Sequence, residues 1–382
     1  MKIGIFESIM TPAGHEIDFD RMLVNELVGI GHDVSLYVPQ NYVFKYDYGV
    51  PVHFLPGQGV SYEGVSGLKK AWLSAKREFN RQRWFKTLYE YACNGQVDAI
   101  IVPTATYRYL RAVNINAIRK SPIPVIFVMH GINPKEAPKF FKEMEKLQEC
   151  PNINAAALLF TEDVFGKKLS KVHCIKPPVF TPRDIEHERT ANDSSTAKLT
   201  LGFFGQYRKE KNLDVFLDTL LSCNIDTEYE MIIQGATVKP EDAADFARIE
   251  QKYKANLQLE FWHKALIGQE WQQAIASVDA LIMPYSATRY RYHWSAMLFT
   301  AIGFNKPVVA AADINPEVFE KYAIGLTFPA SDNKALQNTL EQFINTYNER
   351  KTTYASELAR ANQEYSPRMF AQKLVEIASN VQ

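Results

Sequence analysis

The stretch from residue 280 to 311 constrains the fold more than any other part of the chain. It begins with four apolar residues, 280–283, which indicate a short buried strand, and Pro284 ends that strand. A polar loop follows, residues 295–302 then have the pattern of a helix, and a second apolar run occupies 307–311. Strand, loop, helix and strand in this order form the βαβ unit of a parallel sheet. Open sheets of this kind bind ligands at the carboxyl ends of their strands.

The loop inside this unit carries cations close to the start of the helix. Arg289, Arg291 and His293 come shortly before Ser295 and Ala296. The amino terminus of a helix offers free N–H groups and a positive dipole end, which favour a phosphate group. The loop therefore predicts a phosphate site. The alternative is an ordinary βαβ unit with a solvated basic loop.

The same alternation of apolar runs and helical patterns fills two halves of the 382 residues. We predict an α/β protein with two doubly wound, Rossmann-like domains and a cleft between them. Residues 1–180 would form the first domain, completed by a last helix at 366–382, and residues 199–365 the second. The stretch 181–198 is polar and has no apolar periodicity, which is typical of a linker.

Composition and charge exclude several kinds of partner. The 43 basic and 43 acidic side chains cancel, so no overall charge favours nucleic acid. No apolar run approaches the roughly 20 residues that span a bilayer, and the first residues enter a strand without a signal-peptide pattern. The four cysteines have no metal-ligand spacing. We therefore expect a cytoplasmic protein.

A second cationic loop follows the apolar strand at 199–204. It contains Gly205, Arg208 and Lys211 and leads into a helix that begins at Leu213. Cations beside a glycine and a helix start suit a phosphate group. This loop predicts a second part of the phosphate site.

Two points of the first half also lie at the predicted ligand edge. The loop after the first strand contains Gly14 and His15, and the glycine lets a ligand approach closely because it has no side chain. The strand at 124–129 ends in His130, where the architecture places ligand-facing residues. The alternatives are a structural turn for the loop and a strand cap for the histidine.

A basic helical segment, residues 66–91, carries seven cations against two glutamates. A basic amphipathic helix can lie on an anionic membrane, which predicts peripheral contact with the inner face of the membrane. The alternative is an ordinary surface helix. The predicted apolar stripe comprises Leu68, Trp72, Ala75 and Phe79, continued by Phe85 and Leu88, and the cations are Lys69, Lys70, Lys76, Arg77, Arg81, Arg83 and Lys86.

Four elements of the second half appear in a fixed order. They are G-Q-Y-R-K-E-K-N at 205–212, M-I-I-Q-G at 231–235, L-E-F-W-H-K-A with V-D-A-L-I-M-P-Y between 259 and 285, and Y-R-Y-H-W-S-A-M-L-F-T-A-I-G-F-N-K-P-V-V at 290–309. With these elements the chain resembles family-4 glycosyltransferases of the GT-B type over roughly residues 199–330.

The resemblance implies a GT-B fold and a retaining, hexosyltransferase-like enzyme. Such an enzyme moves a sugar from a nucleotide-diphosphate sugar to a glycan or lipid-linked acceptor, in polysaccharide or glycoconjugate biosynthesis, and needs no metal or other cofactor. The chain lacks an obvious Asp-x-Asp motif. The resemblance places the diphosphate on Gly205, Arg208, Lys211, Arg291, Ser295 and Ala296, the donor sugar, ribose or base near His293, Thr300 and His263, the acceptor near Gly14 and His15, and the reacting sugar near a catalytic His130.

The chain departs from the family pattern at several positions, and one of them is the usual glycine of the third element, which is replaced near Trp262 and His263. Members usually carry two glutamates eight residues apart before the K-P-V-V element, and here Tyr292 and Thr300 stand there. Gln206 replaces the family arginine after the first glycine. Because the second glutamate holds the donor ribose in the family, Thr300 predicts an unusual donor pocket.

Two other functions fit the same fold. A sugar-nucleotide epimerase or hydrolase would share the diphosphate site but would need carboxylates as acid and base, for which Glu7, Glu16 and Glu162 are available. A non-catalytic nucleotide-sugar binder would account for the missing glutamates. Incubation with the donor alone separates the three functions.

Overall fold

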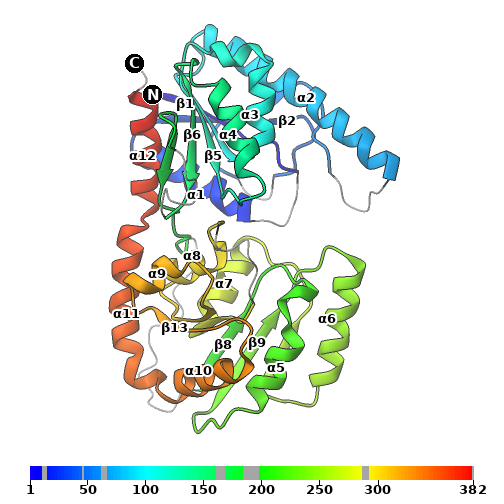
Figure 1. The fold of residues 1–382 in the computed structure, drawn as a ribbon, viewed down its shortest axis with the longest axis vertical. Helices are drawn as coiled ribbons and strands as arrows, with labels where there is room; N and C mark the ends of the chain where they lie inside the picture. The colour runs from blue at the N-terminus through cyan, green and yellow to red at the C-terminus, as the bar shows by residue number, and fades with distance from the viewer. Residues whose placement is uncertain are drawn as a thin grey trace. The chain divides into compact units, whose positions relative to one another are not determined.

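The computed structural model divides into two units, each built on one parallel sheet (Figure 1). Unit 1 comprises Met1–Pro178, Tyr292–Trp294 and Ser366–Gln382, and unit 2 comprises Val179–Arg291 and Ser295–Tyr365. None of the described helices is long and apolar enough to cross a membrane. The structure describes residues 1–10, 15–44, 47–61, 67–160, 168–183, 198–285 and 292–380.

The sheet of unit 1 has seven parallel strands in the order β3-β2-β1-β4-β5-β6-β7. The first strand pairs with β2 on one side and with β4 on the other, so the order of the strands reverses between β1 and β4. The strands are β1 (Lys2–Phe6), β2 (Asp33–Pro39), β3 (Val52–Leu55), β4 (Ala99–Ala105), β5 (Val125–Met129), β6 (Ile153–Leu158) and β7 (Val172–Ile175).

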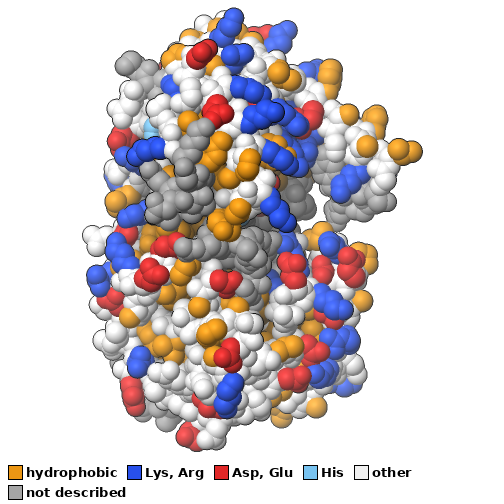
Figure 2. Space-filling view, in the orientation of Figure 1, with side chains coloured by type: hydrophobic (Ala, Val, Ile, Leu, Met, Phe, Trp, Pro, Cys, Tyr) orange, Lys and Arg blue, Asp and Glu red, His pale blue; other side chains and the backbone are white. Residues whose placement is uncertain are grey.

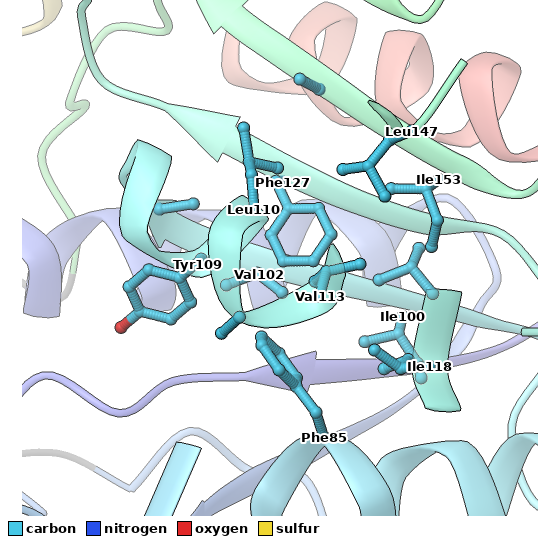
Figure 3. Close-up of a cluster of buried hydrophobic side chains, with 14 of the residues drawn as sticks. Phe85, Ile100, Val102, Tyr109, Leu110, Val113, Ile118, Phe127, Leu147 and Ile153 are labelled. Atoms are coloured by element: carbon cyan, nitrogen blue, oxygen red, sulfur yellow. The ribbon is translucent and has the colours of Figure 1, made fainter. Parts of the chain in front are cut away.

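Helices cover both faces of this sheet. Every residue of the central strand β5 is therefore buried. On one face, Phe127 of β5 packs among side chains of the neighbouring strands and helices, including Leu110 and Val113 (Figure 3). On the other, Phe19 meets Phe370 with ring centroids 5.6 Å apart. The helices are α1 (His15–Gly29), α2 (Gly67–Cys93), α3 (Tyr107–Asn114), α4 (Ala137–Lys146) and α12 (Pro367–Ser379).

Helix α2 corrects one detail of the predicted apolar stripe. Leu68, Trp72 and Phe79 are exposed, whereas Phe85 and Leu88 are buried in the core of unit 1. At about 100° per residue, position 88 lies about 200° and position 85 about 260° from position 68 when viewed down the helix axis. The prediction that they continue the same stripe is therefore wrong, and α2 has two separate apolar faces.

The sheet of unit 2 has six parallel strands in the order β10-β9-β8-β11-β12-β13. Its strands are β8 (Leu199–Phe203), β9 (Tyr229–Gln234), β10 (Leu259–Trp262), β11 (Ala280–Met283), β12 (Val308–Ala311) and β13 (Gly325–Phe328). Its helices are α5 (Leu213–Leu221), α6 (Pro240–Tyr253), α7 (Gln269–Ser277), α8 (Ala296–Gly303), α9 (Pro316–Lys321), α10 (Asn333–Asn345) and α11 (Tyr347–Glu364).

Both sheets have the strand order of a doubly wound fold. Numbered within each unit, the first six strands follow the order 3-2-1-4-5-6, which is that of a Rossmann-like domain. The predicted fold class of two doubly wound parallel sheets is therefore confirmed. In unit 2 the order of the strands reverses between β8 and β11, and the predicted βαβ unit, β11–α8–β12, begins at that point.

Candidate functional site

The point of reversal in unit 2 lies between two adjacent strands that are far apart in the sequence. Leu201 of β8 pairs with Ala280 of β11, and Gly202 pairs with Leu281. Because the strands are parallel, their carboxyl ends meet at the same edge of the sheet. The Gly205 loop begins at that edge, and ligands of open α/β sheets bind at such a point.

Lys211 is held at this edge by two aromatic rings. It ends a short 3₁₀ turn, Lys209–Lys211, and only 7% of the residue is exposed. Its Nζ lies 5.3 Å from the ring centroid of Phe203, the last residue of β8, and 4.2 Å from that of Tyr285, which follows β11. The ring faces attract the ammonium group and fix its position. A cation is thus fixed where the two central strands end.

The loop after β8 is tied to the loop after β9 by its backbone. The amide of Gly205 donates to Oε1 of Gln234 at 2.8 Å, and its carbonyl accepts from the amide of Ala236 at 3.2 Å. Gly205 has φ +108°, and a Cβ added there would meet open space. Glycine adopts this backbone readily, and the missing side chain leaves the loop open to a ligand.

Arg208 has polar partners on both sides. Its guanidinium donates to Oε1 of Gln206 at 3.1 Å and lies 3.6 Å from a carboxylate oxygen of Glu210. Exposed ion pairs of this kind contribute little to stability, so an anionic ligand can replace Glu210 as a partner. Gln206, which stands where the family carries an arginine, here orients the arginine two residues later.

The amino end of α8 is capped by side chains. Oγ of Ser295 accepts from the amide of Leu298 at 3.3 Å, and the amide of Ser295 donates to Oδ1 of Asn315 at 2.8 Å. The helix itself offers no acceptor to the amides of Ala296 and Met297. These two N–H groups are the ones that an anion at the helix end would meet.

Thr300 and His263, two predicted contacts of the donor sugar, ribose or base, each form a hydrogen bond within the protein. The hydroxyl of Thr300 donates to the carbonyl of Ala296 inside α8 at 2.8 Å. His263 follows the edge strand β10 and is exposed, with Nε2 3.1 Å from Oγ1 of Thr237 and its ring 4.7 Å from that of Phe246. The roles of Thr300 and His263 stay predictions.

In unit 1, His130 stands directly after β5. Its Nε2 lies 2.8 Å from the carbonyl oxygen of Pro103. Because a carbonyl only accepts, Nε2 carries the proton, and Nδ1 is the acceptor of the neutral ring. The ring packs against Phe19 at 4.5 Å and Trp294 at 5.8 Å between centroids. Trp294 was missed from the sequence, because nothing local connects it to a residue so far away along the chain.

The close approach of a neighbouring segment explains why a glycine, Gly131, follows His130. It pairs with His293 in an antiparallel bridge, and the amide of Ile132 donates to the carbonyl of Tyr292 at 3.2 Å. A Cβ on Gly131 would lie 2.5 Å from the ring of His293 and from that same carbonyl oxygen. His293, predicted beside the donor sugar or base, therefore groups with unit 1 next to His130. Its role stays a prediction.

Two buried carboxyl groups lie in unit 1 at the corresponding point of its sheet. Glu7 follows β1 and is 2% exposed, and Asp20 of α1 is 1% exposed. Oε1 of Glu7 accepts from the amide of Ile9, whereas Oε2 of Glu7 and Oδ1 of Asp20 have no hydrogen-bond partner among the residues that the structure describes. Burial, reinforced by the charge of Glu16, raises the pKa of Glu7 to about 8. Burial and the neighbouring carboxylates, Glu7 first, also raise the pKa of Asp20 well above its usual value.

The sequence analysis did not single out Asp20, although a signal was present. Asp20, Leu23, Val24 and Leu27 are spaced at i, i+3, i+4 and i+7, which places them on one side of α1. All four are buried. An acidic residue on the apolar side of a helix needs an explanation, because an isolated charge is seldom buried.

The remaining predicted residues fall partly outside the described chain. Four of them are outside the residues that the structure describes: Gly14, Arg289, Arg291 and Glu162. His15 is described only as the first residue of α1. Among the described residues, no group of three or more His, Cys, Asp or Glu side chains is arranged to hold a metal ion.

Comparisons with known proteins agree with this architecture. Residues 198–346 match the family model described as "Glycosyl transferases group 1". No curated protein sequence matches the chain. Among solved structures, Anabaena HepE with UDP and glucose is similar over 100% of both chains, with a TM-score of 0.68 and 16% identity.

Two other solved structures have comparable similarity. The catalytic domain of Arabidopsis thaliana starch synthase IV has a TM-score of 0.69 at 13% identity, and sucrose-phosphate synthase of Thermosynechococcus elongatus has 0.66 at 12%. Each comparison covers 100% of this chain and 99% of the other. The chain has the fold of the GT-B glycosyltransferases, and its residues 198–346 are similar to the glycosyl transferases group 1 model.

Proposed function

We propose that the protein transfers a sugar from a nucleotide-diphosphate sugar to an acceptor. The observation that carries this proposal is the buried ammonium of Lys211, which two rings fix at the carboxyl ends of β8 and β11. That edge belongs to the segment that matches the glycosyl transferases group 1 model. The similar structures include HepE with UDP-glucose and starch synthase IV with ADP and acarbose, which supports a nucleotide-sugar donor.

The chemistry needs positive charge beside the leaving group. When the bond between the anomeric carbon and the diphosphate oxygen breaks, negative charge grows on the diphosphate, and the acceptor oxygen forms the new bond to carbon. Fixed donors and cations stabilise that charge because they need no rearrangement during the reaction. Lys211 and Arg208 supply the cations, and the amides at the start of α8 supply the donors.

The finer parts of the proposal follow the resemblance to family-4 glycosyltransferases. We assign retention of the anomeric configuration, no metal requirement, and a glycan or lipid-linked acceptor in polysaccharide or glycoconjugate biosynthesis. The protein would act in the cytoplasm at the inner face of the membrane. Arg291 and His293 would contact the donor, Gly14 and His15 the acceptor, and His130 the sugar being transferred.

A panel of nucleotide diphosphates and their sugars tests the donor. At 100 times its dissociation constant, a ligand that binds only the folded protein raises the free energy of unfolding by about 2.7 kcal/mol. We expect one nucleotide series to raise the melting temperature clearly above the others. Product analysis with that donor and a set of glycan and lipid-linked acceptors should then show transfer. A panel without any shift would contradict a nucleotide-sugar donor.

The His130→Ala variant tests the role of unit 1. We expect binding of the bare nucleotide diphosphate to stay nearly unchanged and turnover to fall about 10²-fold, because Nδ1 of the ring orients a sugar hydroxyl or takes its proton. Calorimetry and a transfer assay on one preparation give both numbers. His53→Ala removes an exposed histidine from the edge strand β3 and serves as the matched control. Lost nucleotide binding would mean that His130 contacts the nucleotide, and unchanged turnover would make it a strand cap.

A sugar-nucleotide hydrolase or epimerase is the second candidate, favoured by one observation. Glu7 and Asp20 each have a buried carboxyl oxygen without a hydrogen-bond partner in the described part of the chain, and a raised pKa keeps a carboxylic acid protonated for proton transfer. Incubation of the donor without any acceptor distinguishes the functions. Rapid release of free or epimerised sugar would favour this candidate over transfer, and binding without turnover would leave a non-catalytic binder.

A further inference from the structure

Helix α2 exposes large apolar side chains on the side that faces away from its own unit. Leu68 is 91% exposed, Trp72 61% and Phe79 64%. Figure 2 shows hydrophobic and cationic side chains together along the helix labelled α2 in Figure 1. We call Leu68, Trp72 and Phe79, with the cations beside them, the outward face of α2.

The spacing along the helix makes this face continuous. At about 100° per residue, Trp72 and Phe79 lie within about 40° of Leu68 when viewed down the axis. The buried Trp84 and Leu88 lie about 160° and 200° from Leu68, on the other side. A surface helix normally carries polar residues opposite its buried side. Here the first four turns carry a leucine, a tryptophan and a phenylalanine there.

Cations surround these apolar side chains. The Nζ of Lys76 lies 5.4 Å from the ring centroid of Trp72, and the guanidinium of Arg83 lies 5.9 Å from that of Phe79. Lys69 and Lys86 of the same helix are also exposed, and the Nζ of Lys86 lies 3.9 Å from Oε1 of Glu90 at the surface. The whole chain has no net charge, so this is a local excess of positive charge.

Three of the predicted cations lie away from the outward face, because Lys70, Arg77 and Arg81 stand about 180–220° from Leu68 when viewed down the helix axis. Arg81 is buried, its guanidinium donates to Glu78 at 2.6 Å, and it lies 4.2 Å from the ring centroid of Tyr109. Six of the seven predicted cations therefore remain outside the core. Glu78 is one of only two acidic residues in the helix, and it forms an ion pair with Arg81. The pair offsets the negative charge of Glu78, so this carboxylate repels an anionic partner less.

We propose that the outward face of α2 binds an anionic membrane surface. Leu68, Trp72 and Phe79 would enter the interface between head groups and acyl chains, where amphipathic aromatic rings are favoured. The flexible lysines would keep their ammonium groups beside lipid phosphates while their stems cover apolar surface. Protein–protein interface cores are depleted in lysine, and this narrow apolar line flanked by lysines fits a lipid surface better than a protein partner.

The inference deepens the proposed function by favouring the lipid-linked class of acceptor. Only this choice of acceptor rests on the proposed function. Vesicle binding needs neither donor nor turnover. A failure of the membrane test therefore leaves sugar transfer untouched, and a failure of transfer leaves the membrane test valid.

Co-sedimentation of the full-length protein with lipid vesicles tests the proposal. We expect binding to vesicles that contain phosphatidylglycerol, little binding to pure phosphatidylcholine, and a loss of binding as salt rises, because salt screens the cations. The variant Leu68→Ser/Trp72→Ser/Phe79→Ser should bind at least about 10²-fold more weakly, since three exposed side chains no longer enter the interface. Lys69→Gln with Lys76→Gln should weaken binding roughly 25-fold, about fivefold for each charge.

A matched variant controls for the loss of exposed apolar surface. Leu257 lies in unit 2 and is 98% exposed, so Leu257→Ser should bind vesicles like the wild type. Equal binding of the triple variant and the wild type would overturn the proposal, as would absence of wild-type binding to anionic vesicles. Self-association of the wild type that the triple variant abolishes, without vesicle binding, would also overturn it in favour of a contact between two copies of the chain.

Discussion

Replacement of Lys211 by methionine is expected to lower turnover about 10²- to 10³-fold at saturating donor, which is the loss seen when one fixed donor to a developing charge is removed. Methionine is unbranched and apolar and can occupy the space between Phe203 and Tyr285. The substitution therefore removes the charge while it keeps the packing that buries this position. A transfer assay with initial rates over a range of donor concentrations separates turnover from affinity.

A neighbouring lysine provides the control for this result. Lys209 lies in the same 3₁₀ turn, and its side chain is exposed. Lys209→Met should keep wild-type turnover, because its ammonium is not held at the ends of β8 and β11. If the Lys211→Met enzyme turned over as fast as the wild type, the ammonium would have no part in stabilising the leaving group. The proposed diphosphate site would then have to be withdrawn.

The Glu7→Gln variant is expected to unfold less readily than the wild type at pH 9 and about equally at pH 5. Burial raises the pKa of Glu7 to about 8, from the usual 4.5 that the unfolded chain retains. Between these values the native state keeps a proton that the unfolded state releases, so stability falls as pH rises through this window. One pKa unit corresponds to about 1.4 kcal/mol, which gives a difference of about 3–5 kcal/mol at pH 9.

Glutamine keeps the oxygen that accepts from Ile9 and cannot ionise, so the variant avoids this loss. Denaturant unfolding at pH 5, 7 and 9 measures the effect. The exposed Glu149 lies in the same unit, and Glu149→Gln should leave the pH dependence as it is in the wild type. Parallel curves for wild type and Glu7→Gln would show that Glu7 is ionised in the native protein despite its burial.

The strands that could be predicted from the sequence are those buried on both faces. Residues 125–129 and 280–283 are continuous apolar runs, and both are fully buried strands. Strand β3 was missed because it lies at the edge of its sheet, where His53 and Phe54 are exposed and interrupt the pattern. Helix α11 was missed because only Tyr354, Leu358 and Ala361 of its eighteen residues are buried, so its apolar signal is weak.

The parts of the candidate site differ in the same way. Gly205, Arg208 and Lys211 lie in one loop, so their proximity follows from sequence distance alone. The rings that hold Lys211 come from the ends of two strands about eighty residues apart, and only the pairing of β8 with β11 brings them together. The contact of Trp294 with His130 is likewise a property of the fold. Local motifs thus predicted which residues carry charge, and the sheet topology determines what surrounds them.

The division of the chain has a consequence for protein engineering. Unit 1 includes residues 292–294 and 366–382, which lie beyond the polar stretch at 181–198. A chimaera joined at that stretch would take α12 from a different parent than α1, and Phe19 would lose the native Phe370 as its partner. Exchange of unit 2 between relatives of this fold therefore requires two transplanted segments, Val179–Arg291 and Ser295–Tyr365, and a single crossover does not provide them.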